Sequence, residues 1–333
     1  MYSSTILPKV RALRIPHSVS LELTYRCNLD CFYCYNDREK PGKPLSLAQY
    51  ERLLRDLARM QTLFLLFTGG EPLMHPHFFA IGGLSRELGF AVQIRTNGHS
   101  LIPSVAKRIL REIQPYSVEV SLHGATPEVH DRQTRVPGSF ARLLDNLKSA
   151  QALGLRLGAV MTPTAWNEHQ IEDMFRLCDE LGLPLRVQGP VAPRDNGDPT
   201  PLRIRPSDTA WDRAVQAVKR RQPDRSSSKG NSPEEPPALC GVGVAGLDID
   251  PYGNVLACMH LRTPAGNLHE QSIEAIWQHS PIFQRARQAS INAAQRFSQK
   301  PPRQLGAPLF CIAVEENLAK APCSACAKST ESD

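Results

Sequence analysis

The first part of the chain alternates between stretches with the period of a strand and stretches with the period of a helix. Residues 18–24 alternate apolar and polar side chains, which is the pattern of a strand with one buried face. Ser46 and Gln49 then form a capping-box pattern ahead of an amphipathic helix. Residues 63–67 are apolar throughout, as expected of a buried parallel strand. The pattern therefore predicts an initial strand–helix–strand unit.

The same alternation continues along the chain. Further strands are predicted at 91–96, 117–122, 155–161 and 185–188, and further helices at 78–88, 103–113, 139–153 and from Asn167, which has Gln170 three residues on. Six strands that alternate with five helices predict successive right-handed βαβ units in one parallel sheet. Since a closed barrel needs eight such pairs, the predicted fold class is α/β, a partial (β/α)6 TIM-like barrel.

The second half of the chain has a different composition. Residues 222–237, QPDRSSSKGNSPEEPP, lack apolar periodicity and are rich in Ser, Pro and charge, which indicates an exposed linker. Beyond it, strands at 244–249 and 255–258 flank a turn sequence that predicts a β-hairpin and returns Cys258 toward Cys240. We therefore expect an N-terminal extension at 1–17, the partial barrel at 18–200, a helix and linker at 201–238, and a cysteine-rich module at 239–333.

Composition limits where the protein works and what it binds. No apolar run approaches the length of a membrane span, and the N-terminus lacks the apolar core of a signal peptide. The nine cysteines are an odd number, which argues against a disulfide framework. We expect a cytoplasmic chain with no membrane partner. The net charge of +6 is diffuse, which favours a solvated surface over a nucleic-acid interface.

A short loop after the first strand carries three cysteines, Cys27, Cys31 and Cys34. Closely spaced thiolates are the usual ligands of an iron–sulfur cluster, because soft iron prefers them. A cubane cluster has one more iron than this loop has thiolates, so one iron would stay open to another ligand. The alternative is a structural zinc site, which needs a fourth ligand. The first histidine downstream is His75, which lies in a different motif.

Other polar residues follow the predicted strands at the same end. Gly69, Gly70 and Glu71 follow the second strand, Asn97 the third, and Ser121 closes the fourth. All lie at carboxyl ends, the rim where parallel barrels build active sites. The glycines permit close approach of a ligand, and a carboxylate can accept hydrogen bonds from an ammonium group. A tight turn, a turn asparagine and a strand-end serine remain the alternatives. Cys178, in phase with apolar helix positions, is expected in the core.

The spacing Cys27-x3-Cys31-x2-Cys34 resembles the signature of the radical S-adenosylmethionine (SAM) enzymes. That resemblance implies a 4Fe-4S cluster whose open iron binds the amino and carboxylate groups of SAM. An electron from the reduced cluster would cleave SAM, and the resulting 5′-deoxyadenosyl radical would abstract hydrogen from a substrate. The resemblance also implies which residues bind SAM. Tyr33 would pack near the adenine, and Thr68, Gly69, Gly70 and Glu71 would bind the amino end. Asn97 and Ser121 would contact the ribose or the carboxylate, and Arg135, a few residues beyond His130 and Asp131, would contact the carboxylate.

The distal cysteines resemble the SPASM or twitch extension of that family. The pattern runs Cys240-x12-Gly253-x4-Cys258, a segment at 273–277, and Cys323-x2-Cys326. A full SPASM domain has seven cysteines and two clusters, whereas this module has five, so the resemblance implies a twitch-type module with one auxiliary 4Fe-4S cluster. Its implied ligands are Cys240, Cys258, Cys323 and Cys326, with Cys311 as a loose thiol or a replacement. A zinc ribbon is the alternative.

The resemblance also suggests substrates and partners. Relatives with this layout mostly modify ribosomally made peptides, and residues 136–140 look like that group. Others dehydrogenate amino sugars or alter haem precursors, and a zinc-bound RNA-interacting protein is a third hypothesis. Met259, where sulfatase-maturing relatives carry Asp, argues against that activity. Few residues precede the first strand, so we expect no appended leader-binding domain but a separate leader-peptide-binding protein, together with an electron donor such as flavodoxin or ferredoxin.

Overall fold

The computed structural model describes residues 6–189, 191–221, 242–259 and 261–299. The chain divides into two compact units. The barrel unit comprises Leu21–Gly42 and Leu65–Arg221, and the hairpin unit comprises Met1–Ser20, Lys43–Phe64 and Gln222–Asp333. The predicted linker and four of the distal cysteines lie outside the described residues, namely Cys240, Cys311, Cys323 and Cys326.

Six strands form the sheet of the barrel unit, except that residues 18–20 and Phe64 at the starts of the first two are counted in the hairpin unit, and their order in the sheet follows their order in the chain. They are β1 (Ser18–Thr24), β2 (Phe64–Gly69), β3 (Ala91–Thr96), β4 (Ser117–Ser121), β5 (Leu157–Met161) and β6 (Leu185–Val187). The pairs β3–β4, β4–β5 and β5–β6 are parallel. The six predicted strands and the α/β class are therefore confirmed, with β5 two residues shorter at its start than expected.

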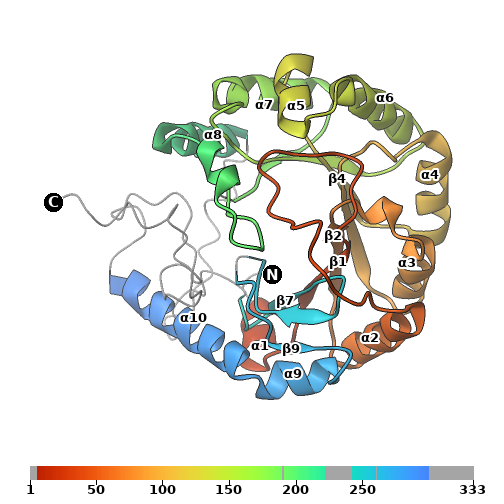
Figure 1. Cartoon of the computed structure of the whole chain (residues 1–333), viewed down its shortest axis with the longest axis vertical. Coiled ribbons are helices and arrows are strands. Elements are labelled where there is room, and N and C mark those ends of the chain that lie inside the picture. Colours follow the sequence, from red (N-terminus) through yellow and green to blue (C-terminus); the bar gives the residue numbers. More distant parts are fainter. Residues whose placement is uncertain (1–5, 190, 222–241, 260, 300–333) are drawn as a thin grey trace. The chain divides into compact units, whose positions relative to one another are not determined.

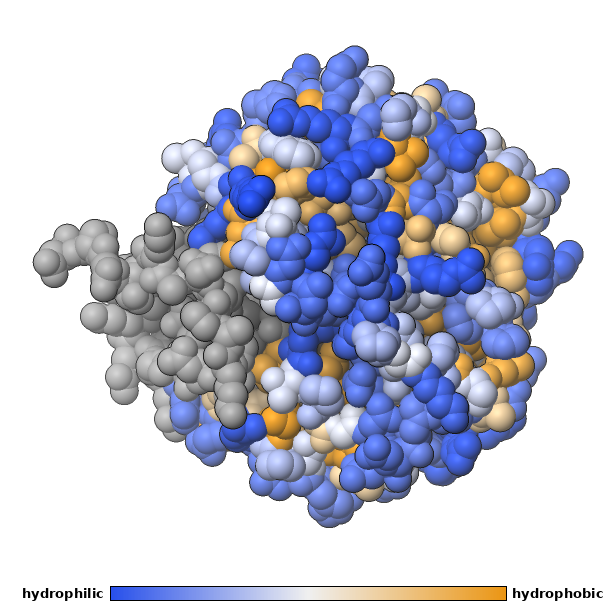
Figure 2. All heavy atoms as spheres, viewed as in Figure 1, coloured by the Kyte–Doolittle hydropathy of each residue, from blue (hydrophilic) through white to orange (hydrophobic). Residues whose placement is uncertain are grey.

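Helices cover the outer side of these strands, as Figure 1 shows for α3, α4, α6 and α7. The helices of this unit are α3 (Phe78–Glu87), α4 (Pro103–Arg108), α5 (Pro127–Thr134), α6 (Ser139–Ala152), α7 (Ile171–Glu180) and α8 (Asp208–Arg221). Buried apolar residues of the strands, such as Ile94, Val118 and Val120, form the core. Figure 2 shows mostly hydrophilic residues on the visible face of these helices, with apolar ones in small patches.

Three segments of the barrel unit differ from the sequence-based expectation. The helix predicted at 103–113 is α4 followed by a turn of π-helix, Ile109–Ile113, which Gln114 ends with a φ of 51°. Asn167 does not cap α7; its side chain donates to the carbonyls of His123 and Thr162. Helix α5 was not predicted, because its segment contains one large apolar residue and so lacks helical periodicity.

The hairpin unit contains α1 (Leu7–Ala12), α2 (Leu47–Arg59), β7 (Gly246–Ile249), β8 (Asn254–Leu256), β9 (Gly266–Asn267), α9 (Ile273–His279) and α10 (Pro281–Gln299). The predicted capping box is present, since Ser46 and Gln49 exchange hydrogen bonds of 3.0 and 3.3 Å. The predicted hairpin is confirmed as the antiparallel pair β7–β8. Its turn is held by Asp250, whose carboxylate accepts from the Asn254 backbone N–H at 3.0 Å. Among the described residues, no helix is both long and apolar enough to cross a membrane.

Candidate active site at the cysteine loop

The loop that carries Cys27, Cys31 and Cys34 follows β1 and is fastened to the end of α5. The backbone N–H of Asp30 donates to the carbonyl of Thr134, and that of Phe32 donates to the carbonyl of Gln133, both at 3.0 Å. Carbonyls in the last turn of a helix have no partner within the helix. The end of α5 therefore offers free acceptors, and the cysteine loop uses two of them.

The three thiols lie in an environment that disfavours bare thiolates. Burial raises the pKa of Cys27 and Cys31 and raises that of Cys34 to about 11. For Cys31, the neighbouring Cys34 and Cys27 raise the pKa further, because adjacent negative charges repel. A bound metal cluster supplies the positive charge that deprotonates such thiols.

The chemistry of the donor set fits an iron–sulfur cluster, because soft iron prefers thiolate ligands. In the part of the chain that the structure describes, no three His, Cys, Asp or Glu side chains stand close enough to share one metal ion. Each thiolate of a cubane binds a different iron, so a cluster requires neighbouring thiolates rather than thiolates that converge on one point. Cys27, Cys31 and Cys34 are the residues that would hold it.

The two glycines at the end of β2, Gly69 within it and Gly70 just beyond, bring its backbone against the start of the cysteine loop. A Cβ atom on Gly70 would lie 2.4 Å from the carbonyl oxygen of Arg26, and one on Gly69, whose φ is +120°, would lie 2.5 Å from that of Thr24. The Gly70 N–H donates to the Thr24 carbonyl at 2.7 Å. The glycines do permit a close approach, as expected, but what approaches them in the structure is the backbone of the cysteine loop and not a ligand.

Glu71 ties the carboxyl ends of β2 and β3 together. Its fully buried carboxylate accepts from the Leu73 N–H at 3.0 Å, the Thr96 hydroxyl at 2.8 Å and the Asn97 N–H at 2.8 Å. Burial raises the pKa of Glu71 to about 7, although these three hydrogen bonds oppose the shift. Oε1 accepts two of the bonds and Oε2 one, so Oε2 keeps the capacity for a further donor. Binding of an ammonium group there stays a prediction.

Asn97 joins the end of β3 to the cysteine loop. Its amide nitrogen donates to Asn28 Oδ1 at 2.7 Å and lies 3.6 Å from Cys27 Sγ. Its own Oδ1 accepts from the His99 N–H at 2.9 Å. Asn97 is thus fixed in orientation, with its amide directed at the first cysteine of the loop.

Arg135 also reaches the cysteine loop. Its guanidinium pairs with Asp30 at 3.3 Å and stacks 4.7 Å from the ring centre of Phe32. Thr68 and Ser121 are half-buried at the ends of β2 and β4, and no side-chain hydrogen bond joins them to the other site residues within the described structure. The structure therefore brings together Cys27, Gly69, Gly70, Glu71 and Asn97, and it places Arg135 against the same loop at Asp30 and Phe32. The roles of Thr68 and Ser121 stay predictions.

Tyr33 has a partner that the sequence did not indicate. Its hydroxyl lies 3.1 Å from the imidazole nitrogens of His123, and the two rings meet edge to face at 5.1 Å. Burial lowers the pKa of His123 well below its ordinary value, so this imidazole is neutral. Its backbone N–H donates to His130 Nδ1 at 3.2 Å. The available signal was that His123 lies just beyond the carboxyl end of a strand. Packing of Tyr33 against adenine stays a prediction.

In the hairpin unit, one of the five distal cysteines is described. Cys258 is half-exposed just beyond β8, and its carbonyl accepts from the Leu261 N–H at 3.0 Å. The other four lie outside the described residues, so the ligand set stays a prediction. Cys178 is 1% exposed in the barrel unit, which confirms its place in the core.

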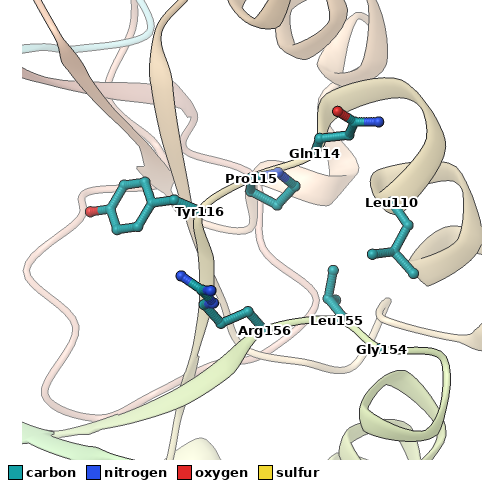
Figure 3. Close-up of a pocket in the computed structure, with 7 residues that line it drawn as sticks. All are labelled: Leu110, Gln114, Pro115, Tyr116, Gly154, Leu155 and Arg156. Atoms are coloured by element: carbon teal, nitrogen blue, oxygen red, sulfur yellow. The ribbon is translucent and has the colours of Figure 1, made fainter.

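A hollow of about 440 Å³ lies elsewhere on the barrel unit, away from the cysteine loop. Figure 3 shows that Tyr116 and Arg156, which directly precede β4 and β5, line it together with Leu110, Gln114, Pro115, Gly154 and Leu155. It therefore lies at the amino ends of the strands, whereas the cysteine loop, Glu71 and Asn97 follow carboxyl ends. The hollow is not part of this site.

Comparisons with known proteins agree on one family. Residues 21–178 match the model of the radical SAM superfamily, and residues 240–303 match the SPASM model, an iron-sulfur cluster-binding domain. Mycofactocin maturase MftC of Mycobacterium ulcerans (strain Agy99) is 31% identical over 294 residues, which are 83% of this chain and 78% of that protein. The AdoMet-dependent heme synthase of Methanosarcina barkeri (strain Fusaro / DSM 804) is 26% identical over 298 residues, 82% and 85% of the two chains.

A solved structure shares the fold. The crystal structure of SuiB from Streptococcus suis superposes with a TM-score of 0.66 at 17% identity, over 85% of this chain and 71% of SuiB. At this identity the likeness shows the fold alone.

Proposed function

The chain belongs to the radical SAM superfamily, in the group with an iron–sulfur-binding SPASM domain, and on that premise we propose that it matures a ribosomally synthesised peptide. It is an iron–sulfur enzyme that uses a 4Fe-4S cluster, SAM and auxiliary iron–sulfur chemistry. When bound, these groups supply an electron and a 5′-deoxyadenosyl radical that removes hydrogen from the substrate. The hypothesis of a zinc-bound RNA-interacting protein is therefore wrong.

The observation that carries the catalytic part is the convergence of the cysteine loop, Glu71 and Asn97 at one rim. In this proposal Cys27, Cys31 and Cys34 hold the cluster, and Glu71 and its preceding glycines bind the amino end of SAM. Asn97 and Ser121 contact the ribose or the carboxylate of SAM, and Arg135 contacts its carboxylate. The hydrogen bonds of Glu71 and Asn97 fix these groups before SAM arrives, so little ordering is needed on binding.

Support for a peptide substrate comes from relatives named maturases and from residues 136–140. That segment is held firmly at the start of α6, because the Asp131 carboxylate accepts from the Gly138 N–H at 2.6 Å and the Phe140 N–H at 2.8 Å. The same proposal includes two partners, a leader-peptide-binding protein and an electron donor such as flavodoxin or ferredoxin. It also includes a cytoplasmic location and one auxiliary cluster, held by Cys240, Cys258, Cys323 and Cys326. The proposal also keeps the predicted segment boundaries, with the partial barrel starting at residue 18, the helix and linker at 201, and the cysteine-rich module at 239.

A second candidate substrate is a tetrapyrrole. It is favoured by the similarity to the AdoMet-dependent heme synthase over most of both chains. The chemistry at the cysteine loop would be the same in either case. The two substrates differ in what must fit inside the barrel unit.

The two candidates are separated by turnover. The cluster-loaded, reduced enzyme would be incubated with SAM and with the peptide encoded by a short reading frame beside its gene, and in parallel with coproporphyrin III. We expect a mass change in the peptide, with one 5′-deoxyadenosine formed for each peptide changed. A changed porphyrin and an unchanged peptide would overturn the peptide proposal in favour of the second candidate.

A further inference from the structure

The inner face of β3 and β4 is polar, whereas the interior of a closed barrel is apolar. The β3–β4 register places Gln93 opposite Ser117 and Arg95 opposite Glu119, and the Gln93 amide donates to the Ser117 hydroxyl at 2.9 Å. Between them, Ile94 and Val118 face the other way and are fully buried. The interior of a closed (β/α)8 barrel is filled mainly by branched apolar side chains. A polar inner row is therefore suited to a ligand.

Two arginines on this inner face share one carboxylate. Glu119, on β4, accepts from Arg95 on β3 at 3.0 Å and from Arg186 on β6 at 2.7 and 2.8 Å. Arg186 reaches Glu119 across β5, where the residue paired with Glu119 is Gly158. A Cβ atom at that glycine would lie 3.9 Å from Glu119 Cγ, so a longer side chain there would fill the space that the ion pair occupies.

The charges of this cluster do not balance. Two guanidinium groups face one carboxylate, which leaves one positive charge in excess. Nε of Arg95 is buried and has no hydrogen-bond acceptor within the described structure. The Arg186 side chain is 55% exposed, so one side of the cluster is open. An anion bound at the open side would compensate this partly buried positive charge and accept a hydrogen bond from the unused donor, and both effects favour its binding.

The cluster lies directly below the proposed site of SAM. Arg95 on β3 precedes Asn97, the first residue after that strand, by two positions, and Glu119 precedes Ser121 by two positions on β4. Two residues of a strand span about 6.6 Å, and both members of each pair lie on the same face. The arginines therefore occupy an inward-facing layer of the barrel, two residues nearer the amino ends of the strands than Asn97 and Ser121.

We propose that Arg95 and Arg186 bind a carboxylate of the substrate, with Glu119 holding both guanidinium groups in position. Guanidinium binds carboxylate in a planar, two-point arrangement, which gives orientation as well as affinity. This inference rests on the proposed function, because it names the group by which that substrate is held. The carboxylate is the C-terminus of a peptide, or a propionate if the substrate is a tetrapyrrole.

Binding of paired acid and amide probes tests this subsite. The first pair is a hexapeptide mixture without Asp or Glu, made with free C-terminal acids and with C-terminal amides. The second pair is coproporphyrin III and its tetra-amide. Each probe would be equilibrated with the cluster-loaded, SAM-bound enzyme, and the retained probe measured by mass spectrometry. The variants are Arg95→Gln and Arg186→Gln, and the matched control is Arg176→Gln, which removes an ion-paired arginine from the outer helix α7.

We expect the acid of one pair to be retained at least about tenfold more than its amide, as the loss of a charge-assisted bond implies. The Arg176→Gln variant keeps this preference for the acid, and the Arg186→Gln variant loses it. Because the Arg186 side chain is largely exposed, we expect the Arg186→Gln variant to fold. The pair that shows the preference identifies the source of the carboxylate. Equal retention of acid and amide, retention of neither pair, or an undiminished preference in Arg186→Gln would overturn the inference. Formation of 5′-deoxyadenosine in the same samples tests the proposed function separately.

Discussion

Replacing Gly70 by Ala should dislodge the cysteine loop. The new Cβ atom would lie 2.4 Å from the Arg26 carbonyl oxygen and 2.7 Å from that of Tyr25, and both are backbone atoms that cannot rotate away. The backbones must separate, which breaks the hydrogen bonds from Gly70 to Thr24 and from Glu71 to Arg26. Overpacking and two lost hydrogen bonds together predict a loss of about 3–5 kcal/mol in the free energy of unfolding.

Gly83 provides the matched control. It lies in α3, and a Cβ atom there would meet only the Glu112 carbonyl oxygen at 3.8 Å, an ordinary contact. Since Ala is the better helix former, Gly83→Ala should stabilise by about 0.5–1 kcal/mol. The assay is anaerobic urea denaturation followed by circular dichroism, with iron counted after reconstitution. A Gly70→Ala protein that matches the wild type in both measurements would refute the role assigned to this contact.

Two other residues give further predictions. Burial raises the pKa of Glu71 to about 7 in the folded protein. As the pH rises, the unfolded chain therefore loses this proton at a lower pH than the folded protein does. The free energy of unfolding should therefore fall by up to about 3 kcal/mol as the pH rises from about 4.5 to 7. Urea denaturation across that range checks this, and a Glu71→Gln variant with the same pH dependence would contradict it. Asp131→Asn should cost about 1–3 kcal/mol, because one carboxylate accepts from Gly138, Ser139 and Phe140. An unchanged urea midpoint would show that these bonds contribute nothing.

Much of the fold could be predicted because its signals are local. Alternation marked the strand at 18–24, the capping box marked the start of α2, and the turn sequence marked the β7–β8 hairpin. The rim could also be predicted, since the carboxyl ends of parallel strands necessarily share one edge of the sheet. Each of these inferences needs only a few neighbouring residues.

The rest depends on contacts between distant segments. Helix α5 has almost no apolar pattern, yet the carbonyls of Gln133 and Thr134 hold the cysteine loop. The partner of Gly70 is Arg26, and no local pattern links the two. Arg95, Glu119 and Arg186 read as ordinary polar positions of three separate strands until the register brings them together.

The most direct test of radical SAM chemistry in this protein is the detection of 5′-deoxyadenosine. The protein would be reconstituted anaerobically with iron and sulfide, reduced, and supplied with SAM. We predict 5′-deoxyadenosine from the wild type and from the core variant Cys178→Ala. We predict none from the variant with Ala at Cys27, Cys31 and Cys34, which should still bind the iron of the auxiliary module. A wild-type protein that binds zinc instead of iron and sulfide and forms no 5′-deoxyadenosine would contradict the assignment, as would cleavage of SAM by the triple variant.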